Sequence, residues 1–355
     1  MKPRPVVSSV GMLAVLLLVA GAAHAGLTCS PIPEATFAID GITSLNAAVI
    51  NPSSPVTGTV NATGCDIAVY FSPGEKGSVK NATIFGAIKA GIVNNGAKVA
   101  IDSNAVYQIG DNPLSGVQYG LAIYVYGLGT RASGDVTNNT IWDYQKNGIT
   151  IKASDSNVVG NTVIGQGPVS YIAQNGIEIA YGSNSTVANN RVFGMSYTGA
   201  NNASSAGILL IGGAYFGHPL QTKTLVENND LSGNDVGVWL ANLAADGINP
   251  DTSAPGKNVV AYNAIRNNGI FNTTGGPLTA TAAPFYPYQA GVTVQDSKDT
   301  VVGNSICGIG YTPEASMPPY LYRVDSSLAV SLSQWSNGCD TDHDGPGWGG
   351  PHEAR

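Results

Sequence analysis

Copies of two short motifs recur between residues 136 and 240 and restrict the possible folds more than any other feature of the chain. The first motif is an asparagine followed two residues later by Ile, Val or Leu, and the second has the form Gly-[Ile/Val]-x-[Ile/Leu]. One copy has room only for strands of roughly three to five residues, which cannot bury their own apolar side, so the copies must stack to form a common core. The motifs begin at Asn139, Gly148, Asn161, Gly176, Asn190, Gly207, Asn229 and Gly237.

The same motifs continue on both sides of this region. A unit of about 22 residues recurs, with insertions in the longer copies, and each unit predicts three short strands. No window has a convincing helical period. The sequence therefore predicts an all-β fold, a single-stranded right-handed parallel β-helix of about ten coils with a cap at each end. Further asparagine copies stand at Asn104, Asn263 and Asn304, and the related sequence Asn-Ala-Thr occurs at Asn61 and Asn81.

Alternation along the glycine motifs assigns side chains to the two sides of a strand. It places Ile149 and Ile151 in the core and Thr150 and Lys152 outside. The recurring asparagine is expected at a tight bend, in the left-handed conformation, where stacked copies hydrogen-bond to the backbone and to one another. The alternation rule predicts four further exposed side chains, Glu178, Leu209, Trp239 and Thr293.

The two motifs resemble those of right-handed parallel β-helix repeat proteins, a family that includes the NosD-like and pectate-lyase-like groups. The resemblance covers roughly residues 61–306. It implies the architecture strongly and a function weakly, because many chemistries occur on one fold. The familiar polygalacturonase motifs Asn-Thr-Asp, Asp-Asp, Gly-His-Gly and Arg-Ile-Lys are missing, and so is the Asp-Pro-His pattern of alginate epimerases.

The two ends of the chain are predicted to differ from the repeat. Residues 1–25 have the layout of a cleaved secretory signal peptide, with a basic start, an apolar run and small residues at the end. The β-helix and its N-terminal cap are expected over residues 26–310, and a C-terminal cap and tail over 311–355. We therefore expect a secreted or periplasmic protein whose mature chain has no membrane span.

The four cysteines lie in two pairs near the two ends of the expected β-helix. In an oxidising compartment the economical pairing is Cys29 with Cys65 and Cys307 with Cys339, so that each bridge staples one terminus. Unpaired buried thiols are the alternative.

The charge of the chain and its insertions favour a carbohydrate partner. The net charge is −7, and an acidic, exported chain is a poor nucleic-acid binder because that affinity comes mostly from Lys and Arg. Insertions on a rigid scaffold often carry function, and here they contain Tyr171 and Tyr215. Sugar faces stack on aromatic rings, so we expect a polysaccharide or a surface glycan as the partner. The sequence leaves the oligomeric state open.

Successive coils place equivalent outward side chains about 4.8 Å apart. This stacking predicts a stripe that contains Tyr124, Lys152, Glu178 and Trp239. Tyr124 and Trp239, with the two loop tyrosines, are the predicted substrate-binding residues. A purely structural interpretation competes with this one, since Lys152 and Glu178 on neighbouring coils could form a surface ion pair worth under about 1 kcal/mol.

Two kinds of catalysis suit the ionisable residues near this stripe. Glu178 with Asp143 or Asp235 would provide the two carboxylates that glycoside hydrolysis needs. Lys152 or Lys146 would instead remove a proton next to a uronate carboxylate. The predicted catalytic residues are thus Asp143, Lys152, Glu178 and Asp235.

The C-terminal tail spaces three carboxylates as calcium loops do. Asp340, Asp342 and Asp344 are the candidate Ca²⁺ ligands, and no other cofactor is indicated. Pro351 stands where an EF-hand has glutamate, so an acidic solvated tail is the competing interpretation. His218 lies in a Gly/Pro loop and is expected to be a surface residue.

Two hypotheses from different classes follow. The first is a secreted carbohydrate-active enzyme, a polysaccharide lyase or glycoside hydrolase. The second is a non-catalytic secreted or surface protein that binds glycan or another protein through its inserted loops. Low charge density and the missing motifs favour the second, and the fold resemblance with its aromatic loops favours the first.

Overall fold

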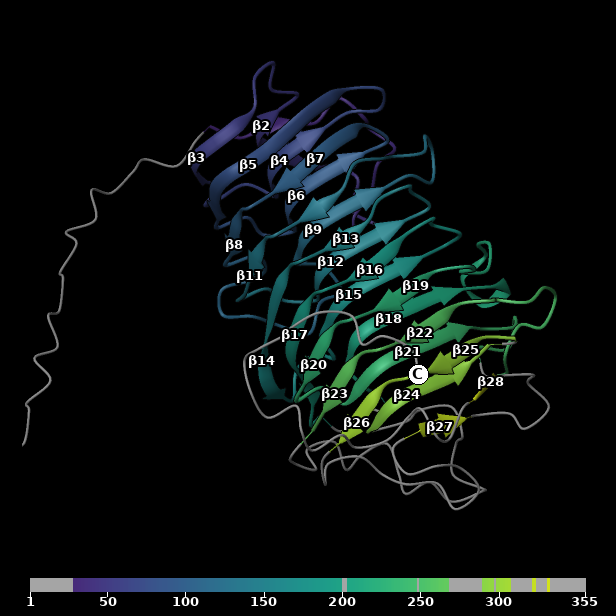
Figure 1. The fold of residues 1–355 in the computed structure, drawn as a ribbon. Helices are drawn as coiled ribbons and strands as arrows, with labels where there is room; N and C mark the ends of the chain where they lie inside the picture. Colours follow the sequence, from purple (N-terminus) through teal and green to yellow (C-terminus); the bar gives the residue numbers. More distant parts are fainter. Residues whose placement is uncertain are drawn as a thin grey trace, which may run out of the picture.

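The structure is a computed structural model, and it describes residues 28–199, 203–247, 249–267, 289–296 and 298–307 together with two short strands further on, 321–323 and 331–332. The strands stack coil upon coil along one axis (Figure 1). The predicted all-β parallel solenoid is therefore confirmed. The number of coils and the boundaries at 25 and 310 stay predictions.

One sheet runs along the whole solenoid and contains eleven of the described strands. Every pairing in it is parallel except the first, in which β1 runs antiparallel to β2. Its strands in order are β1 (Ser30–Pro31), β2 (Asn46–Ile50), β4 (Ile67–Phe71), β6 (Ala90–Asn95), β9 (Leu121–Tyr126), β12 (Asn147–Lys152), β15 (Asn175–Ala180), β18 (Ala206–Gly212), β21 (Val236–Asn242), β24 (Ala290–Gln295) and β27 (Leu321–Arg323).

The second sheet has seventeen described strands arranged as two adjacent stacks. After each strand of the first sheet, a coil usually adds one strand to each stack, separated by a bend. The first stack holds β3 (Val56–Asn61), β5 (Lys76–Phe85), β7 (Lys98–Asp102), β10 (Val136–Thr137), β13 (Val158–Val159), β16 (Thr186–Ala188), β19 (Leu225–Glu227), β22 (Val259–Ala261), β25 (Thr300–Val302) and β28 (Ser331–Leu332). The second holds β8 (Ala105–Tyr107), β11 (Thr140–Ile141), β14 (Thr162–Val169), β17 (Arg191–Tyr197), β20 (Asp230–Ser232), β23 (Ala264–Arg266) and β26 (Ser305–Cys307), and β5 reaches across to pair with β8.

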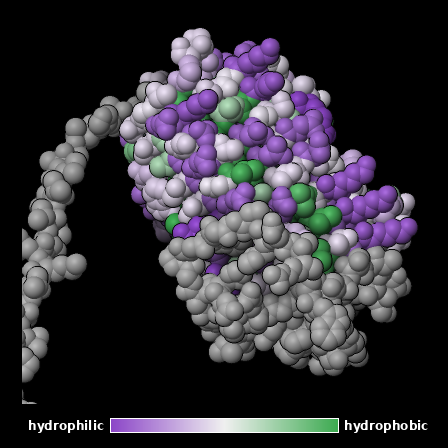
Figure 2. Space-filling model, in the orientation of Figure 1, coloured by the Kyte–Doolittle hydropathy of each residue, from purple (hydrophilic) through white to green (hydrophobic). Residues whose placement is uncertain are grey.

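Helical structure is almost absent from the described residues. The single helix there is a short 3-10 turn, η1 (Ala214–Phe216). No helix in this part of the chain is long and apolar enough to cross a membrane. On the face drawn in Figure 2, the hydrophobic residues of the described surface occur in separate patches between hydrophilic ones.

A ladder of buried asparagines runs along the bend between the two stacks of the second sheet. From Asn104 to Asn263, the backbone N–H and the side-chain Nδ2 of each member donate to Oδ1 of the asparagine in the next coil, as Asn161 does to Asn190 at 2.9 and 3.0 Å. The second Nδ2 proton goes to a carbonyl oxygen of the preceding coil, Val136 O for Asn161. The predicted coil-to-coil hydrogen bonding is thus confirmed. The members are Asn104, Asn139, Asn161, Asn190, Asn229, Asn263 and Asn304.

Two details of the asparagine prediction are wrong. The left-handed residue is not the ladder asparagine but the residue before it, for example Asn138 (φ 55°) and Asn189 (φ 57°), because that residue turns the chain while the next side chain stays aligned with the axis. Neither Asn61 nor Asn81 belongs to the ladder. Asn81 is itself the left-handed residue, and Ala82 occupies the ladder position, where its N–H donates to Asn104 Oδ1.

The core contains the residues that alternation assigned to it. Ile149 and Ile151 are fully buried. The predicted exposure of Thr150, Glu178 and Thr293 is wrong, since all three are buried. Outward side chains in one column are only about 4.8 Å apart, so short or hydrogen-bonded ones are covered by longer neighbours. Lys152, Leu209 and Trp239 are half-buried.

The N-terminal segment 32–45 lies along the outer face of the first sheet instead of only closing the end of the solenoid. Phe37 packs against Tyr70, Tyr124 and Tyr126 at ring distances of 5.6, 6.2 and 5.2 Å. This apolar contact gives the outward face of β4, β6 and β9 a cover.

A disulfide joins Cys29 to Cys65, with 5.5 Å between the Cα atoms, and it confirms the first predicted pair. Cys339 lies outside the described residues, so the pairing of Cys307 with Cys339 stays a prediction.

Two buried carboxyl groups meet near the C-terminal end of the first sheet. Asp296 accepts Nδ2 protons from Asn242 and Asn258 at 2.6 and 2.9 Å, and Asp299 accepts the backbone N–H of Asn258 at 2.7 Å. Burial, and next the negative charge of Asp296, raises the pKa of Asp299 to about 9. Burial and the neighbouring charge therefore both favour the protonated form of Asp299 in the folded protein.

We expect Asn190→Ala to lower the free energy of unfolding by about 3 kcal/mol, because it leaves donors of Asn161 buried without an acceptor. The thermal unfolding midpoint followed by circular dichroism measures the effect. Asn189→Gly is the matched control, since Asn189 is exposed at a left-handed position that glycine adopts freely. Equal losses in the two variants would contradict the role of the ladder.

We expect the buried Asp299 to make stability fall as pH rises. The unfolded carboxyl loses its proton near its ordinary pKa and the folded one keeps it to about 9, so stability is complete at low pH and declines between these values. The slope contributed is up to about 1.4 kcal/mol per pH unit. Asp299→Asn should flatten the dependence of unfolding free energy on pH between about 6 and 8.5. An unchanged slope in the variant would show that Asp299 is ionised in the folded state.

Candidate functional site

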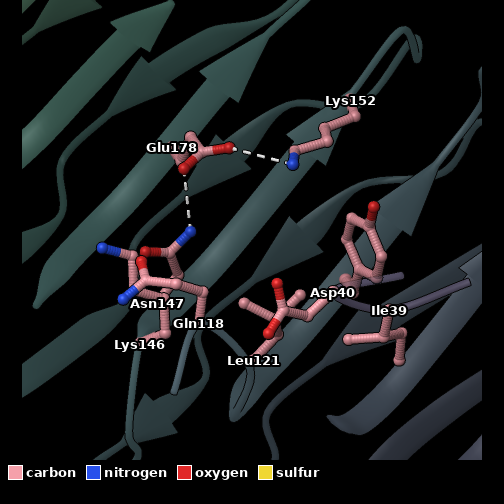
Figure 3. A pocket seen from close by; sticks show the side chains of 9 residues that line it. Ile39, Asp40, Gln118, Leu121, Lys146, Asn147, Lys152 and Glu178 are labelled. Atoms are coloured by element: carbon pink, nitrogen blue, oxygen red, sulfur yellow. Dashed lines mark hydrogen bonds and ion pairs between the residues drawn. The ribbon is translucent and has the colours of Figure 1, made fainter. Parts of the chain in front are cut away.

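A cavity of about 250 Å³ opens on the outward face of the first sheet, beside the N-terminal segment. One wall is the face of β9, β12 and β15, and the opposite wall comes from the N-terminal segment through Ile39 and Asp40 (Figure 3). The cavity is therefore the space between the N-terminal segment and the outer face of the first sheet at this point. The lining residues are Ile39, Asp40, Gln118, Leu121, Tyr124, Lys146, Asn147, Lys152 and Glu178.

Glu178 is the central charged group of this cavity. Its Oε2 accepts the Nδ2 proton of Asn147 at 2.8 Å, and Lys152 Nζ lies 3.5 Å from its Oε1 (Figure 3). That separation is longer than a direct charge-assisted hydrogen bond. Oε1 is buried and has no hydrogen-bond donor among the described residues. The nearest cation to this oxygen is the ammonium group of Lys152, so the carboxylate is held between Asn147 and Lys152.

The ion pair between Lys152 and Glu178 is not a surface pair. The side chains are 23% and 7% exposed, so solvent screens their attraction less than it would at the surface. Removing one partner would leave the other as an uncompensated charge in a mostly buried site. The structural interpretation that made this pair a weak surface contact is therefore excluded.

A short chain of amides fixes the side chain of Asn147. Asn175 Nδ2 donates to Asn147 Oδ1 at 3.1 Å, and Asn175 Oδ1 accepts the backbone N–H of Ala206 at 3.1 Å. Asn147 must therefore present its Nδ2 to Glu178 and to Thr150 Oγ1. Sequence reasoning missed both asparagines, although each directly precedes the glycine of its motif and the repetition of Asn-Gly was visible.

The two lysines of the cavity have opposite pKa shifts. Burial lowers the pKa of Lys146 in spite of the opposing charge of Glu178, and the positive charge of Lys152 lowers it further. The Nζ of Lys146 donates to Ala173 O at 2.9 Å. Burial also acts to lower the pKa of Lys152, but the negative charge of Glu178 and the two phenol groups beside it outweigh burial and raise it. Lys152 is therefore a fixed cation, and Lys146 is the amine that loses its proton more easily.

Lys152 also contacts aromatic rings on both sides. Its Nζ lies 5.7 Å from the ring centre of Tyr124 and 5.3 Å from that of Tyr181. A cation over a ring face is attracted by the ring quadrupole, which adds to the pull of Glu178. The Lys152 ammonium group consequently lies between the ring of Tyr124, which lines the cavity, and the ring of Tyr181 in the next coil.

The strand register corrects the predicted stripe. Thr150 pairs with Tyr124 and with Glu178, whereas Lys152 pairs with Tyr126 and Ala180. Lys152 therefore stands one outward position further along the strand than Tyr124 and Glu178. The misplacement arose from aligning Gly120 with Gly148, because Gly120 lies in the turn before β9 and Ala122 occupies the glycine position. The true column is Tyr124, Thr150, Glu178, Leu209, Trp239 and Thr293.

The sequence of the chain matches the family described as right handed beta helix region over residues 56–243 and 122–317. The chain belongs to this right-handed β-helix family. A comparison with curated protein sequences finds no match.

Solved structures similar to this β-helix protein include those of one enzyme. DFA-IIIase from Arthrobacter chlorophenolicus without its lid, in complex with GF2, is 13% identical with a TM-score of 0.43, over 83% of this chain and 70% of that chain. A cysteine-to-alanine mutant of that enzyme in complex with DFA-III is 15% identical with a TM-score of 0.38, over 83% and 72% of the two chains. The family membership rests on the sequence match.

The β-helix brings two of the four predicted catalytic residues together, Lys152 and Glu178. Asp143 does not line the cavity, and it accepts a hydrogen bond from Gln166 Nε2 at 3.0 Å. Asp235 is fully buried, where it accepts Ser196 Oγ at 2.8 Å and the backbone N–H groups of the loop that leads into β18. A pairing of Glu178 with either aspartate therefore has no geometric support.

The predicted substrate-binding aromatics are spread over the β-helix. Tyr124 lines the cavity. Tyr171 hydrogen-bonds to Gln166, and Tyr215, in the middle of η1, is 57% exposed. Trp239 lies two coils beyond Glu178 in the same column, and its Nε1 donates to Gln295 Oε1 at 2.7 Å. Only Tyr124 is therefore part of the cavity.

The candidate calcium ligands Asp340, Asp342 and Asp344 lie outside the described residues. Within the described ranges, no group of three or more His, Cys, Asp or Glu side chains is arranged to hold a metal ion. The calcium site stays a prediction.

We expect the two cavity lysines to titrate on opposite sides of the ordinary lysine pKa. Reductive ¹³C-methylation followed by NMR titration should give Lys146 a pKa below that of an exposed lysine and Lys152 a pKa above it. Glu178→Gln should lower both values, since the carboxylate favours the charged form of each amine. Lys146→Arg and Lys152→Arg assign the signals. Equal pKa values for the two lysines would contradict the division of roles.

Proposed function

We propose that this β-helix protein binds a glycan and holds one of its sugar units in the cavity beside Glu178. The observation that carries the proposal is the lining of this cavity, where the paired charges of Lys152 and Glu178 meet the amide of Asn147. Sugar hydroxyls both donate and accept hydrogen bonds, so they match a lining that offers donors and acceptors.

The chemistry of the lining supports a polyhydroxylated ligand. Lys152 and Gln118 offer donors, Glu178 and Asp40 offer acceptors, and Tyr124 contributes an apolar ring. Cavities for drug-sized ligands start at about 300 Å³, so this smaller one suits a single sugar ring. A largely apolar ligand would leave the ionised groups without partners.

A lyase is a second candidate, favoured by the lowered pKa of Lys146. In such a reaction the free amine takes a proton from the carbon next to a uronate carboxylate, and that electron pair forms a carbon–carbon double bond. The bond from the neighbouring carbon to the glycosidic oxygen breaks, and this oxygen takes a proton from water. Lys152 would stay protonated and face the substrate carboxylate.

Hydrolysis receives less support from the same lining. It needs two carboxyl groups that flank the scissile bond. Among the described lining residues Glu178 and Asp40 are the carboxylates, and Asp40 is an exposed residue of the N-terminal segment. The balance of charged groups in the cavity thus favours binding or elimination.

Calorimetric titration with glucose, galactose, fructose and galacturonate tests the binding. We expect at least one sugar to bind to the wild type and Glu178→Gln to weaken it at least about tenfold, because a hydrogen bond to a charged group is lost. Glu227→Gln on the second sheet is the matched control and should bind as the wild type does. No binding by any sugar, or equal binding by Glu178→Gln, would contradict the proposal.

Uronate oligosaccharides separate the two candidates. A lyase would generate an unsaturated product that is followed by ultraviolet absorbance, and Lys146→Met would abolish the signal while keeping the affinity within a few fold. Binding without product formation assigns the protein as a glycan-binding protein.

A further inference from the structure

We propose that the outward surface of β15, β18 and β21 beside the cavity is a second sugar subsite, so that the glycan lies along the solenoid axis. This inference rests on the proposed glycan binding at Glu178. The surface, called the platform below, consists of four half-buried side chains around a small apolar floor. These side chains are Tyr181, Leu209, Phe216 and Trp239, and the floor is Ala180, Ile211 and Ala241.

The platform continues directly from the cavity through the strand register. The column that holds Glu178 continues as Leu209 and Trp239 in the next two coils. The column that holds Lys152 continues with the floor residues, beginning at Ala180. Each step is one strand spacing of about 4.8 Å, so Trp239 stands about 10 Å from Glu178 along the axis. A sugar next to one in the cavity would therefore lie over the platform.

Lys152 belongs to both regions. Its ammonium group lies near the ring of Tyr124 in the cavity and near the ring of Tyr181 on the platform, at 5.7 and 5.3 Å. A ligand that occupied both regions would pass over a single cation whose charge is already fixed by Glu178. The cavity and the platform are thus contiguous.

Tyr181 has a backbone conformation that is unusual for a bulky residue. Its φ is 62°, in the left-handed region. The residues at the same place in the neighbouring coils are Ala153 and Gly212, so the turn itself does not need an aromatic side chain. Its side chain packs on the apolar floor and against His218, so it forms one edge of the platform.

An inserted loop supports the platform from the side. The His218 ring lies 4.1 Å from the ring of Tyr181, and the Phe216 ring lies 6.0 Å from it. The loop is tied to the following coil, where Tyr215 N donates to Leu243 O at 3.1 Å and Ala214 N donates to Asp251 at 3.0 Å. The rings of Tyr181, Phe216 and His218 are therefore held in place before a ligand binds, and they do not have to be ordered on binding.

The neighbours of His218 give it a defined charge. Burial, and next the positive charge of Lys152, lowers its pKa below the ordinary value of 6.5. The imidazole is neutral at pH 7, so its two nitrogens can donate one hydrogen bond and accept another. A sugar hydroxyl at the edge of the platform matches these two functions. His218 was expected to be a surface residue without a role, and the structure places it beside the site.

Chain length is the variable that tests the platform. The affinities of glucose and galacturonate are compared by calorimetry with those of their linear di- and trisaccharides. We expect a gain of about tenfold from mono- to disaccharide in the wild type, and Trp239→Ala and Phe216→Ala should each remove most of it. The affinity for the monosaccharide should not change.

Trp142→Ala is the matched control for this experiment. Trp142 is a half-buried tryptophan on the second sheet, stacked on Tyr107 at 4.6 Å. It should leave both affinities unchanged. Far-ultraviolet circular dichroism checks that each variant is folded, and Phe216→Tyr, which keeps the ring, should retain the gain.

The outcomes separate the two proposals. Monosaccharide binding that depends on Glu178, without any gain from chain length or with the same gain in Trp239→Ala, overturns the platform alone. No binding of any saccharide by the wild type overturns the proposed function and the platform together. If Trp142→Ala and Trp239→Ala lose the same share of the gain in affinity from mono- to disaccharide, the platform is also overturned.

Discussion

The amide of the ladder asparagines is the interaction on which the rest of the molecule depends. In the middle of the ladder, each of these side chains uses both Nδ2 protons and its Oδ1 accepts two, as the side chain of Asn190 does. The bend is thereby locked to one geometry in coil after coil. Because this spacing is fixed, the loops between the coils can vary in length without shifting the sheets.

Because the spacing between coils is fixed, the position of a residue within the repeat determines which residues it lies next to. Once the register is set at the bend, the outward residues of the first sheet form straight columns, and residues that are about 30 apart in the chain become neighbours. Glu178, Asn147 and Asn175 meet in this way from two coils. A substitution in one coil therefore acts on the electrostatics of the next one, as Glu178 does on Lys152.

The periodic part of the structure could be predicted from the sequence because period and packing are linked. The apolar residues at Ile149 and Ile151, the stacked asparagines and the first disulfide all follow from local chemistry. The site could be predicted only in part. Lys152 and Glu178 were found because they interrupt the repeat, but the register of Tyr124 was misplaced by two residues, since Gly120 imitates a motif glycine.

The remainder of the site had no periodic signal. Ile39 and Asp40 reach the cavity because a segment before the repeat folds back over the outer face, and nothing in its composition announces that path. His218 and Phe216 come from an insertion whose direction depends on contacts with the following coil. Such contacts are non-local, so they become visible only once the coils are in place.

The wall of the cavity has a covalent restraint, the disulfide, in addition to the non-covalent contacts that hold the floor. The segment with Ile39 and Asp40 lies within the ring of chain that Cys29 and Cys65 close, 36 residues apart. The floor is held by stacked strands, whereas the wall is also restrained by a covalent loop whose closure removes entropy from any opened state. Reduction of this bridge is thus expected to loosen the wall of the cavity more than the stacked strands that form its floor.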